Sequence, residues 1–82
     1  MNIKLRKQPE KYLRQVDANT RAKLYKALDR LATMHGDIKP LQGQPNRYRY
    51  KIAHYRIVFD LDRHNQIITV VEINTRTNIK YS

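Results

Sequence analysis

Hydrophobic and polar residues alternate most regularly along residues 47–61, and this pattern predicts a β-hairpin of two antiparallel strands. Ala53 and His54 interrupt the alternation and are the predicted turn. Successive side chains of a strand point to opposite faces of its sheet. The apolar positions therefore share one face, which is predicted to be core: Tyr48, Tyr50, Ile52, Tyr55, Ile57, Phe59 and Leu61. The basic positions share the other face: Arg47, Arg49, Lys51 and Arg56.

Two helices are predicted before the hairpin. Pro9 suits the first turn of one helix, because its missing N–H costs nothing there. Asp17 and Asn19 are both suitable N-cap residues and mark the start of the next helix. This second helix is amphipathic, since its apolar residues recur at spacings of three and four: Leu24, Ala27, Leu28, Leu31 and Met34. Gly36 is expected to end it.

Two further strands and a loop complete the predicted fold. Residues 2–6 alternate, which suits a short edge strand, and residues 66–73 form a β-branched run that is apolar on both faces, as in mid-sheet. Residues 37–46 contain proline and glycine and are predicted to be a loop. The order strand, helix, helix, strand, strand, strand predicts an α+β fold in which both helices pack on one face of a mostly antiparallel four-stranded sheet. We expect residues 1–82 to form a single small domain.

Charge adds a functional constraint to this fold. The chain of 82 residues has 17 Lys and Arg against 7 Asp and Glu, a formal net charge of +10, which attracts polyanions or an acidic protein. No acidic residue lies between Asp37 and Asp60, so the sequence predicts that the basic face of the hairpin has no local neutralising partner. No apolar run approaches the roughly 20 residues of a membrane-spanning helix, and the N-terminus lacks an apolar signal core. A cytoplasmic protein is expected.

The residues offer few conventional catalytic groups. There is no Cys, the acids are sparse, and His35, His54 and His64 are widely separated, so neither a metal site nor a cofactor is predicted. Arginine, lysine and tyrosine instead fit phosphodiester chemistry, because guanidinium groups bind phosphate bidentately and stabilise the charge of its transition state. RNA brings its own nucleophile, the 2′-OH, so a protein need only align it and move protons.

Lys51 is the candidate proton acceptor within the basic face. It would lie beside Arg49 and Arg56, and neighbouring positive charge favours the neutral form of an amine. The alternative interpretation of these residues is a solvated sheet face that binds nothing. The tyrosines of the apolar face are expected in the core rather than stacked on bases, and the simplest role for His54 is that of a turn residue.

Three segments carry a resemblance to a known family: Leu41-Gln42-Gly43, the hairpin from Tyr48 to Phe59, and Ile73-Asn74-Thr75-Arg76. They look like the Leu-x-Gly motif, the Tyr-Arg-x-Arg-x-Gly-x-Tyr-Arg core and the strand-end arginine of the RelE/ParE superfamily of bacterial toxin–antitoxin toxins. The likeness spans nearly the whole chain, and it is closer to the RelE-like mRNA-interferase branch.

The resemblance implies a type II toxin that cleaves mRNA in the ribosomal decoding site (the A site), needs no metal or cofactor, and forms a hetero-oligomer with a cognate antitoxin protein. By position it assigns the catalytic role to Arg49, Lys51, Arg56 and Arg76. Further RNA contacts are expected from Arg47, His54, Lys80 and Tyr81.

The sequence also departs from the family pattern. Lys51 stands where many relatives have Arg, Ala53 replaces a turn glycine, and His54 occupies a position that is often acidic. The C-terminal helix that carries a catalytic tyrosine in several members is short or absent, and Tyr81 falls one place beyond the position expected from an Arg-x-x-x-Tyr spacing. Two alternative functions remain open: a ParE-like poison of DNA gyrase that cleaves no RNA, and a catalytically inactive RNA-binding relative.

Overall fold

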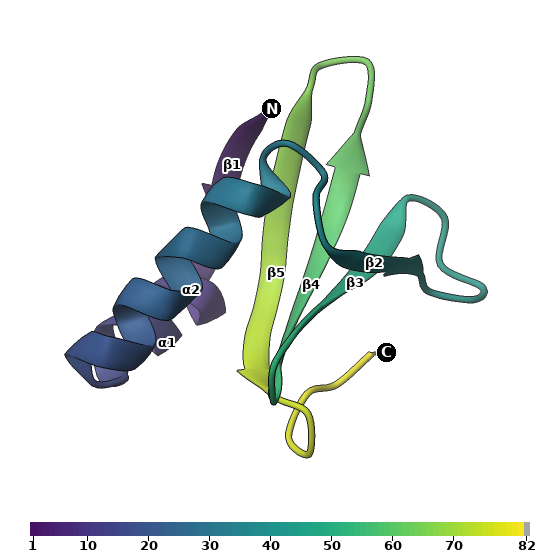
Figure 1. The fold of residues 1–82 in the computed structure, drawn as a ribbon. Helices are drawn as coiled ribbons and strands as arrows, with labels where there is room; N and C mark the ends of the chain where they lie inside the picture. The colour runs from purple at the N-terminus through teal and green to yellow at the C-terminus, as the bar shows by residue number, and fades with distance from the viewer. Residues whose placement is uncertain (82) are drawn as a thin grey trace.

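Seven elements follow one another along residues 1–81, the part of the chain that the structure, a computed structural model, describes. They are β1 (Asn2–Leu5), α1 (Lys7–Gln15), α2 (Ala18–Leu31), β2 (Asp37–Pro40), β3 (Arg47–Ile52), β4 (Tyr55–Asp62) and β5 (Ile67–Thr75). The strands form one sheet in the order β1-β5-β4-β3-β2, in which β1 runs parallel to β5 and the other neighbours are antiparallel. Both helices lie on one face of this sheet (Figure 1), which confirms the predicted α+β fold.

Helix α2 begins where the sequence indicates and ends earlier than predicted. The Asp17 carboxylate caps its first turn, accepting hydrogen bonds from the backbone N–H of Thr20 at 3.1 Å and from the hydroxyl of the same residue at 2.6 Å. At the other end, Met34 adopts a left-handed φ of 57°, and the N–H of His35 bonds the carbonyl of Arg30 at 3.1 Å. The expected end near Gly36 was therefore wrong, because Met34 takes the left-handed capping position that glycine usually fills.

Strand β2 was not predicted, and it gives the sheet a fifth strand. Its residues fall within the expected loop, yet Asp37 pairs with Lys51 and Ile38 pairs with Tyr50 of β3. Aspartate and proline are rare in strands, which hid this element from the sequence pattern. Pro40 is tolerated because β2 is an edge strand, where the missing N–H leaves no ladder bond unmade.

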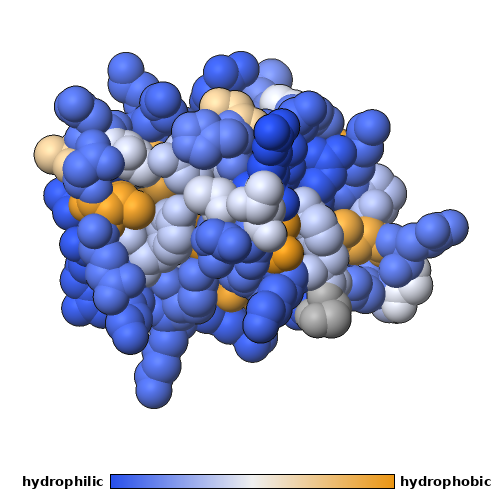
Figure 2. Space-filling model, turned by 90° about the horizontal axis from the view of Figure 1, so that it is seen from below, coloured by the Kyte–Doolittle hydropathy of each residue, from blue (hydrophilic) through white to orange (hydrophobic). Residues whose placement is uncertain are grey.

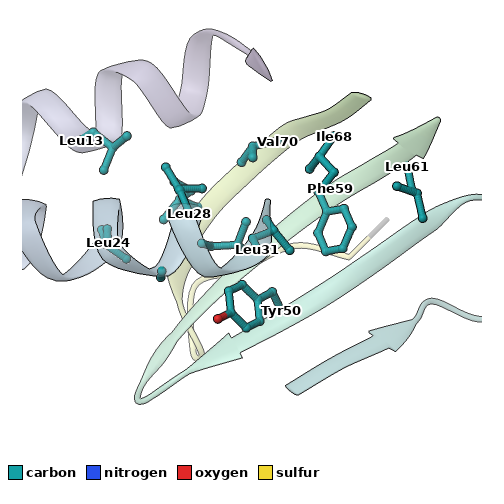
Figure 3. Close-up of a cluster of buried hydrophobic side chains, with 12 residues drawn as sticks. Leu13, Leu24, Leu28, Leu31, Tyr50, Phe59, Leu61, Ile68 and Val70 are labelled. Carbon is teal, nitrogen blue, oxygen red and sulfur yellow. The ribbon is translucent and has the colours of Figure 1, made fainter. Parts of the chain in front are cut away.

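The core fills the space between the helices and the sheet. Figure 3 shows leucines of α2 directed toward the aromatic rings of Tyr50 and Phe59, which are 3% and 0% exposed. The predicted apolar face of the hairpin is confirmed at Tyr50, Ile57, Phe59 and Leu61. Tyr48 and Tyr55 were also expected to be buried, but they are half-buried and pack at the margin of the core. The ring of Tyr48 stacks on Phe59 with centroids 5.5 Å apart.

Strand β5 lies inside the sheet, between β1 and β4, as its β-branched run predicts. A bulge interrupts its pairing with β4: Phe59 pairs with Val70, whereas Val58 pairs with Glu72. The extra residue changes the alternation, so that Val70 before the bulge and Ile73 after it both reach the core. Glu72 is thereby placed opposite Val58, on the other face of the sheet.

Candidate functional site

The register of the hairpin gathers three of the predicted site residues on the face of the sheet away from the helices, called here the outer face. Lys51 and Arg56 are direct cross-strand partners, and Arg49, two residues before Lys51, pairs with Val58. Paired residues of antiparallel strands share a face, as do residues two apart on one strand. The strand residues of the outer face that matter for the site are Arg47, Arg49, Lys51, Arg56, Val58, Asp60 and Glu72. The predicted grouping of Arg49, Lys51 and Arg56 on one face is confirmed.

Arg76 joins this group from a distant part of the chain. It directly follows β5, and its backbone N–H bonds the carbonyl of His54 in the hairpin turn at 2.8 Å. Both residues are exposed, and the His54 ring packs beside Tyr55 with centroids 4.1 Å apart. Figure 2 views this end of the molecule, where β5 stops and the hairpin turns, and shows a mainly hydrophilic surface with small, separate hydrophobic areas.

The guanidinium of Arg56 is held over the hairpin turn. Its Nη1 donates to the carbonyls of Ala53 at 3.0 Å and of Tyr55 at 2.8 Å. Ala53 forms the turn with a φ of 50°, a conformation that costs a non-glycine residue on the order of 1 kcal/mol. These bonds orient Arg56 beside Lys51 before any ligand arrives, and such preorganisation is what charge stabilisation in catalysis requires.

Arg47 is engaged in an ion pair. Its Nε and Nη2 donate to the two carboxylate oxygens of Asp60 at 2.7 and 2.9 Å. This hydrogen bonding holds the pKa of the Asp60 carboxyl below its usual value and raises the pKa of Arg47. The expectation that the basic face has no local acidic partner was therefore wrong here, because the antiparallel pairing brings Asp60 directly opposite Arg47. A phosphate at Arg47 would compete with this carboxylate.

Arg49 is partly enclosed, whereas Lys51 and Arg76 are exposed. Its side chain is 17% exposed, and its Nη2 lies 3.8 Å from the Asp37 carboxylate, too far for a hydrogen bond. Its Nη1 is buried and has no hydrogen-bond partner among the residues that the structure describes. Val58, its cross-strand partner, is only 2% exposed although the helices cover the opposite face.

The C-terminal segment, residues 77–81, turns back after β5 (Figure 1), and its contacts with Glu72 and Gln44 place it against the outer face. The N–H of Ile79 bonds the carbonyl of Thr75 at 2.9 Å, and the N–H of Lys80 approaches the Glu72 carboxylate at 3.4 Å. Nε2 of Gln44, in the loop before β3, donates to the carbonyl of Tyr81 at 2.5 Å. The side chain of Lys80 is exposed and that of Tyr81 is half-buried.

Several outer-face residues were missed by the sequence analysis. Asp60 could have been found, since the alternation of β4 places it on the same face as Arg56. Asp37 depended on the unexpected strand β2, and Glu72 depended on the bulge in β5. The local sequence pattern does not mark Gln44, because its contact with Tyr81 exists only once the C-terminal segment has turned back.

Two further features of the described residues bear on the site. Within residues 1–81, no three His, Cys, Asp or Glu side chains gather closely enough to hold a metal ion. Neither α1 nor α2, the helices of that range, is long and apolar enough to cross a membrane.

Comparison with solved structures finds the same fold in several proteins. The isolated RelE toxin of E. coli superimposes with a TM-score of 0.75 at 19% identity, covering 90% of this chain and 82% of that one. RelE in the RelE–RelB complex of Pyrococcus horikoshii gives 0.75 at 19% identity, covering 95% and 97%. The YoeB/ParE toxin of Agrobacterium tumefaciens gives 0.73 at 15% identity, covering 92% and 98%. Identities this low establish a shared fold.

The sequence itself decides the family. Residues 3–79 match the family described as the ParE toxin of the type II toxin-antitoxin system parDE. The chain therefore belongs to this family, within the RelE/ParE superfamily of type II toxins. A comparison with curated protein sequences found no significant match.

Proposed function

We propose that this toxin is an endoribonuclease that cleaves mRNA in the A site of the ribosome and thereby inhibits translation. The observation that carries the proposal is the grouping of Arg49, Lys51 and Arg56 on the outer face, with Arg76 at the adjoining strand end. Four cations grouped in this way suit a phosphodiester backbone. A shallow face also suits a substrate that arrives already bound to a large partner.

The chemistry proposed for this site uses the 2′-OH of the substrate as nucleophile. Its oxygen attacks the adjacent phosphorus while Lys51 acts as the base that takes its proton. The bond to the 5′-oxygen then breaks, the leaving oxygen takes up a proton from water, and the products are a 2′,3′-cyclic phosphate and a 5′-OH. Arg56 and Arg76 stabilise the extra negative charge of the pentacovalent phosphorus. Arg49 positions the phosphate.

The remaining predicted RNA contacts surround this centre. His54 lies in the turn beside the backbone of Arg76, and Lys80 is exposed on the C-terminal segment. Tyr81 is half-buried there, which leaves part of its ring accessible for stacking. Arg47 would contribute only by exchanging the Asp60 carboxylate for a phosphate.

We also propose that a cognate antitoxin protein binds and neutralises the toxin as a hetero-oligomer in the cytoplasm. The net charge of +10 favours an acidic partner. RelE–RelB complexes are among the solved structures that share this fold, those of P. horikoshii and E. coli having TM-scores of 0.75 and 0.73. Co-expression with the adjacent reading frame should restore growth, and absence of rescue by either neighbour would contradict the pairing.

A second function, inhibition of DNA gyrase without RNA cleavage, is favoured by one observation. The family that the sequence matches is described as the ParE toxin, whereas the RelE likeness is one of fold. Induction of the toxin in growing cells separates the two functions when translation, mRNA integrity and DNA breaks are measured in parallel. Ribonuclease activity predicts shortened mRNA with intact DNA, and DNA breaks with intact mRNA would assign the toxin to gyrase.

Substitution of Arg56 tests the site itself. Loss of one preorganised charge-stabilising donor typically lowers the rate on the order of 10²–10³-fold, so Arg56→Ala should nearly abolish cleavage of ribosome-bound mRNA. Arg63→Ala is the matched control, because Arg63 is an exposed arginine in the turn between β4 and β5, away from the hairpin turn. Equal loss of cleavage in both variants, or none in Arg56→Ala, would contradict the assignment.

The source of the nucleophile is tested with the substrate. A single 2′-deoxy nucleotide on the 5′ side of the cut should block cleavage, because no 2′-OH remains to attack. Undiminished cleavage of the deoxy substrate would refute this chemistry.

A further inference from the structure

Arg49 presents an unusual polar atom. Its Nη1 is buried and makes no hydrogen bond to the residues that the structure describes, while its Nη2 reaches Asp37 only at 3.8 Å. Taking a charged donor out of water without a partner is unfavourable, so a buried guanidinium normally has its N–H groups paired. This arrangement leaves a strong phosphate-binding group enclosed and unused.

The C-terminal segment covers this part of the outer face. Its two anchors are Glu72, which receives the N–H of Lys80, and Gln44, which donates to the carbonyl of Tyr81. Glu72 pairs with Val58 and Val58 pairs with Arg49, so these residues follow one another across the sheet between the anchors. Val58 is only 2% exposed although the helices lie on the opposite face, as expected if the returning segment lies over this row of residues.

Two opposing effects act on the segment. Burial of the Val58 side chain and the bond from Gln44 favour the closed position. The unpaired Nη1 of Arg49 favours opening, because water or a phosphate oxygen would then satisfy it. The contact between Lys80 and Glu72 is long, at 3.4 Å, and adds little. A segment held by so few contacts opens locally far more readily than the core unfolds.

We propose that residues 77–81 are an autoinhibitory segment that withholds Arg49 from RNA until the contact between Gln44 and Tyr81 opens. Lys51 is exposed in the closed state and Arg56 is half-exposed, so an RNA phosphate reaches these cations first. Arg49 then binds the phosphate as well, once the segment has left the outer face. The identity of the ligand rests on the proposed function, whereas closure over Arg49 does not.

The decisive experiment measures the accessibility of Arg49 in the full chain. Gln44→Glu is nearly isosteric, removes the donor to Tyr81 and places a carboxylate against that carbonyl. Gln42→Glu is the matched control, because Gln42 is an exposed residue of the same loop and the charge change is identical. Each protein is treated with phenylglyoxal, and the rate of modification of each arginine is measured by mass spectrometry.

Arg49 should react several-fold faster in Gln44→Glu than in wild type or Gln42→Glu, about three- to tenfold for the loss of one hydrogen bond. The exposed Arg63 should react at the same rate in all three proteins. An unchanged rate at Arg49 in Gln44→Glu, or reaction of Arg49 in wild type as fast as Arg63, would overturn the autoinhibitory role. If Gln44→Glu does not fold, Ile79→Ser is used instead, because it weakens the half-buried part of the segment without touching the loop.

RNA binding then distinguishes this inference from the proposed function. A 2′-O-methyl RNA oligonucleotide, which cannot be cleaved, should bind Gln44→Glu about three- to tenfold more tightly than Gln42→Glu. Adding Arg49→Ala to both variants should remove the difference. Faster modification of Arg49 without any gain in RNA affinity would support closure of the segment over Arg49 but refute RNA as the ligand of Arg49. If the wild type cleaves RNA but the reactivity of Arg49 is unchanged in Gln44→Glu, the autoinhibitory role of the segment is refuted and the proposed ribonuclease activity stands.

Discussion

The basic side chains on the outer face differ in their exposure and in the groups that they contact. Arg47 is paired with Asp60, Arg49 is enclosed, and Arg56 is tied to the carbonyls of the hairpin turn. Lys51 is exposed, and its cross-strand partners are Asp37 and Arg56. Lys51 is thus the most accessible of these four side chains.

Lys51→Arg tests whether that residue moves a proton. Arginine keeps the positive charge but does not release its proton near neutral pH. If Lys51 is the proton acceptor, single-turnover cleavage of ribosome-bound mRNA should slow by about 10²-fold or more while binding is retained. Cleavage at the wild-type rate would mean that Lys51 only binds phosphate.

Asp60→Asn tests the pair with Arg47 through its pH dependence. The folded-state pKa of Asp60 lies below that of the unfolded chain, so the pair stabilises the fold above about pH 4 and this contribution is lost as the pH falls further. The urea midpoint of Asp60→Asn should therefore be lower than that of wild type at pH 7, and the two should converge toward about pH 2. The effect will be modest, because solvent screens a carboxylate that is 33% exposed.

The control for this measurement is Asp29→Asn. Asp29 is exposed on α2 and makes no ion pair with any residue in the range 1–81. Its midpoint should follow that of wild type at every pH. A gap between wild type and Asp60→Asn that stays constant down to pH 2 would show that the substitution acts through packing rather than charge.

At the scale of elements, the connection from α2 to β2 depends on a close contact. Gly36 has a φ of +125°, and a Cβ at this position would lie 2.4 Å from the ring of Tyr50. Tyr50 is buried in the core and is the cross-strand partner of Ile38. Gly36 therefore lets the chain pass over the ring and enter the edge strand.

Gly36→Ala should destabilise the fold by about 2 kcal/mol or more, from backbone strain together with overpacking against Tyr50. Gly43→Ala is the matched control, because Gly43 also has a positive φ, of +74°, but nothing lies within 4 Å of an added Cβ. It should cost only about 1 kcal/mol, the strain alone. Urea unfolding of both variants makes the comparison, and equal losses would argue against the contact with Tyr50.

For the whole molecule, the net charge of +10 acts across a small body of 34 × 24 × 23 Å. The Debye length is about 20 Å at 20 mM salt and about 7 Å at 200 mM, so mutual repulsion spans the molecule only at low salt. The ion pairs among the described residues, Arg47 with Asp60 and Arg49 with Asp37, offset little of this excess.

The melting temperature should therefore rise by a few degrees between about 20 and 200 mM NaCl, because screening relieves self-repulsion. A variant with Lys23→Gln and Lys26→Gln, both on the exposed side of α2, should show a smaller rise. Calorimetry over a salt series gives the result. A melting temperature that falls with added salt would mean that local ion pairs outweigh the net charge.

The sequence by itself determined the parts of the protein that follow from local periodicity. The alternation in residues 47–61 is a two-residue period, which places Tyr50 and Arg49 on opposite faces wherever the hairpin lies. The interior position of β5 followed in the same way from a β-branched run, whereas the sequence offered both Asp17 and Asn19 as caps of α2 and the structure selects Asp17.

Tertiary structure decided what depends on contacts between distant segments. β2 is a strand because β3 supplies its hydrogen-bonding partner, which outweighs the poor strand propensity of Asp37 and Pro40. The bulge in β5 turned Glu72 to the outer face, where it meets the C-terminal segment. Enclosure of Arg49 has no signature in the local pattern, because burial is a property of what packs above a residue rather than of its neighbours in the chain.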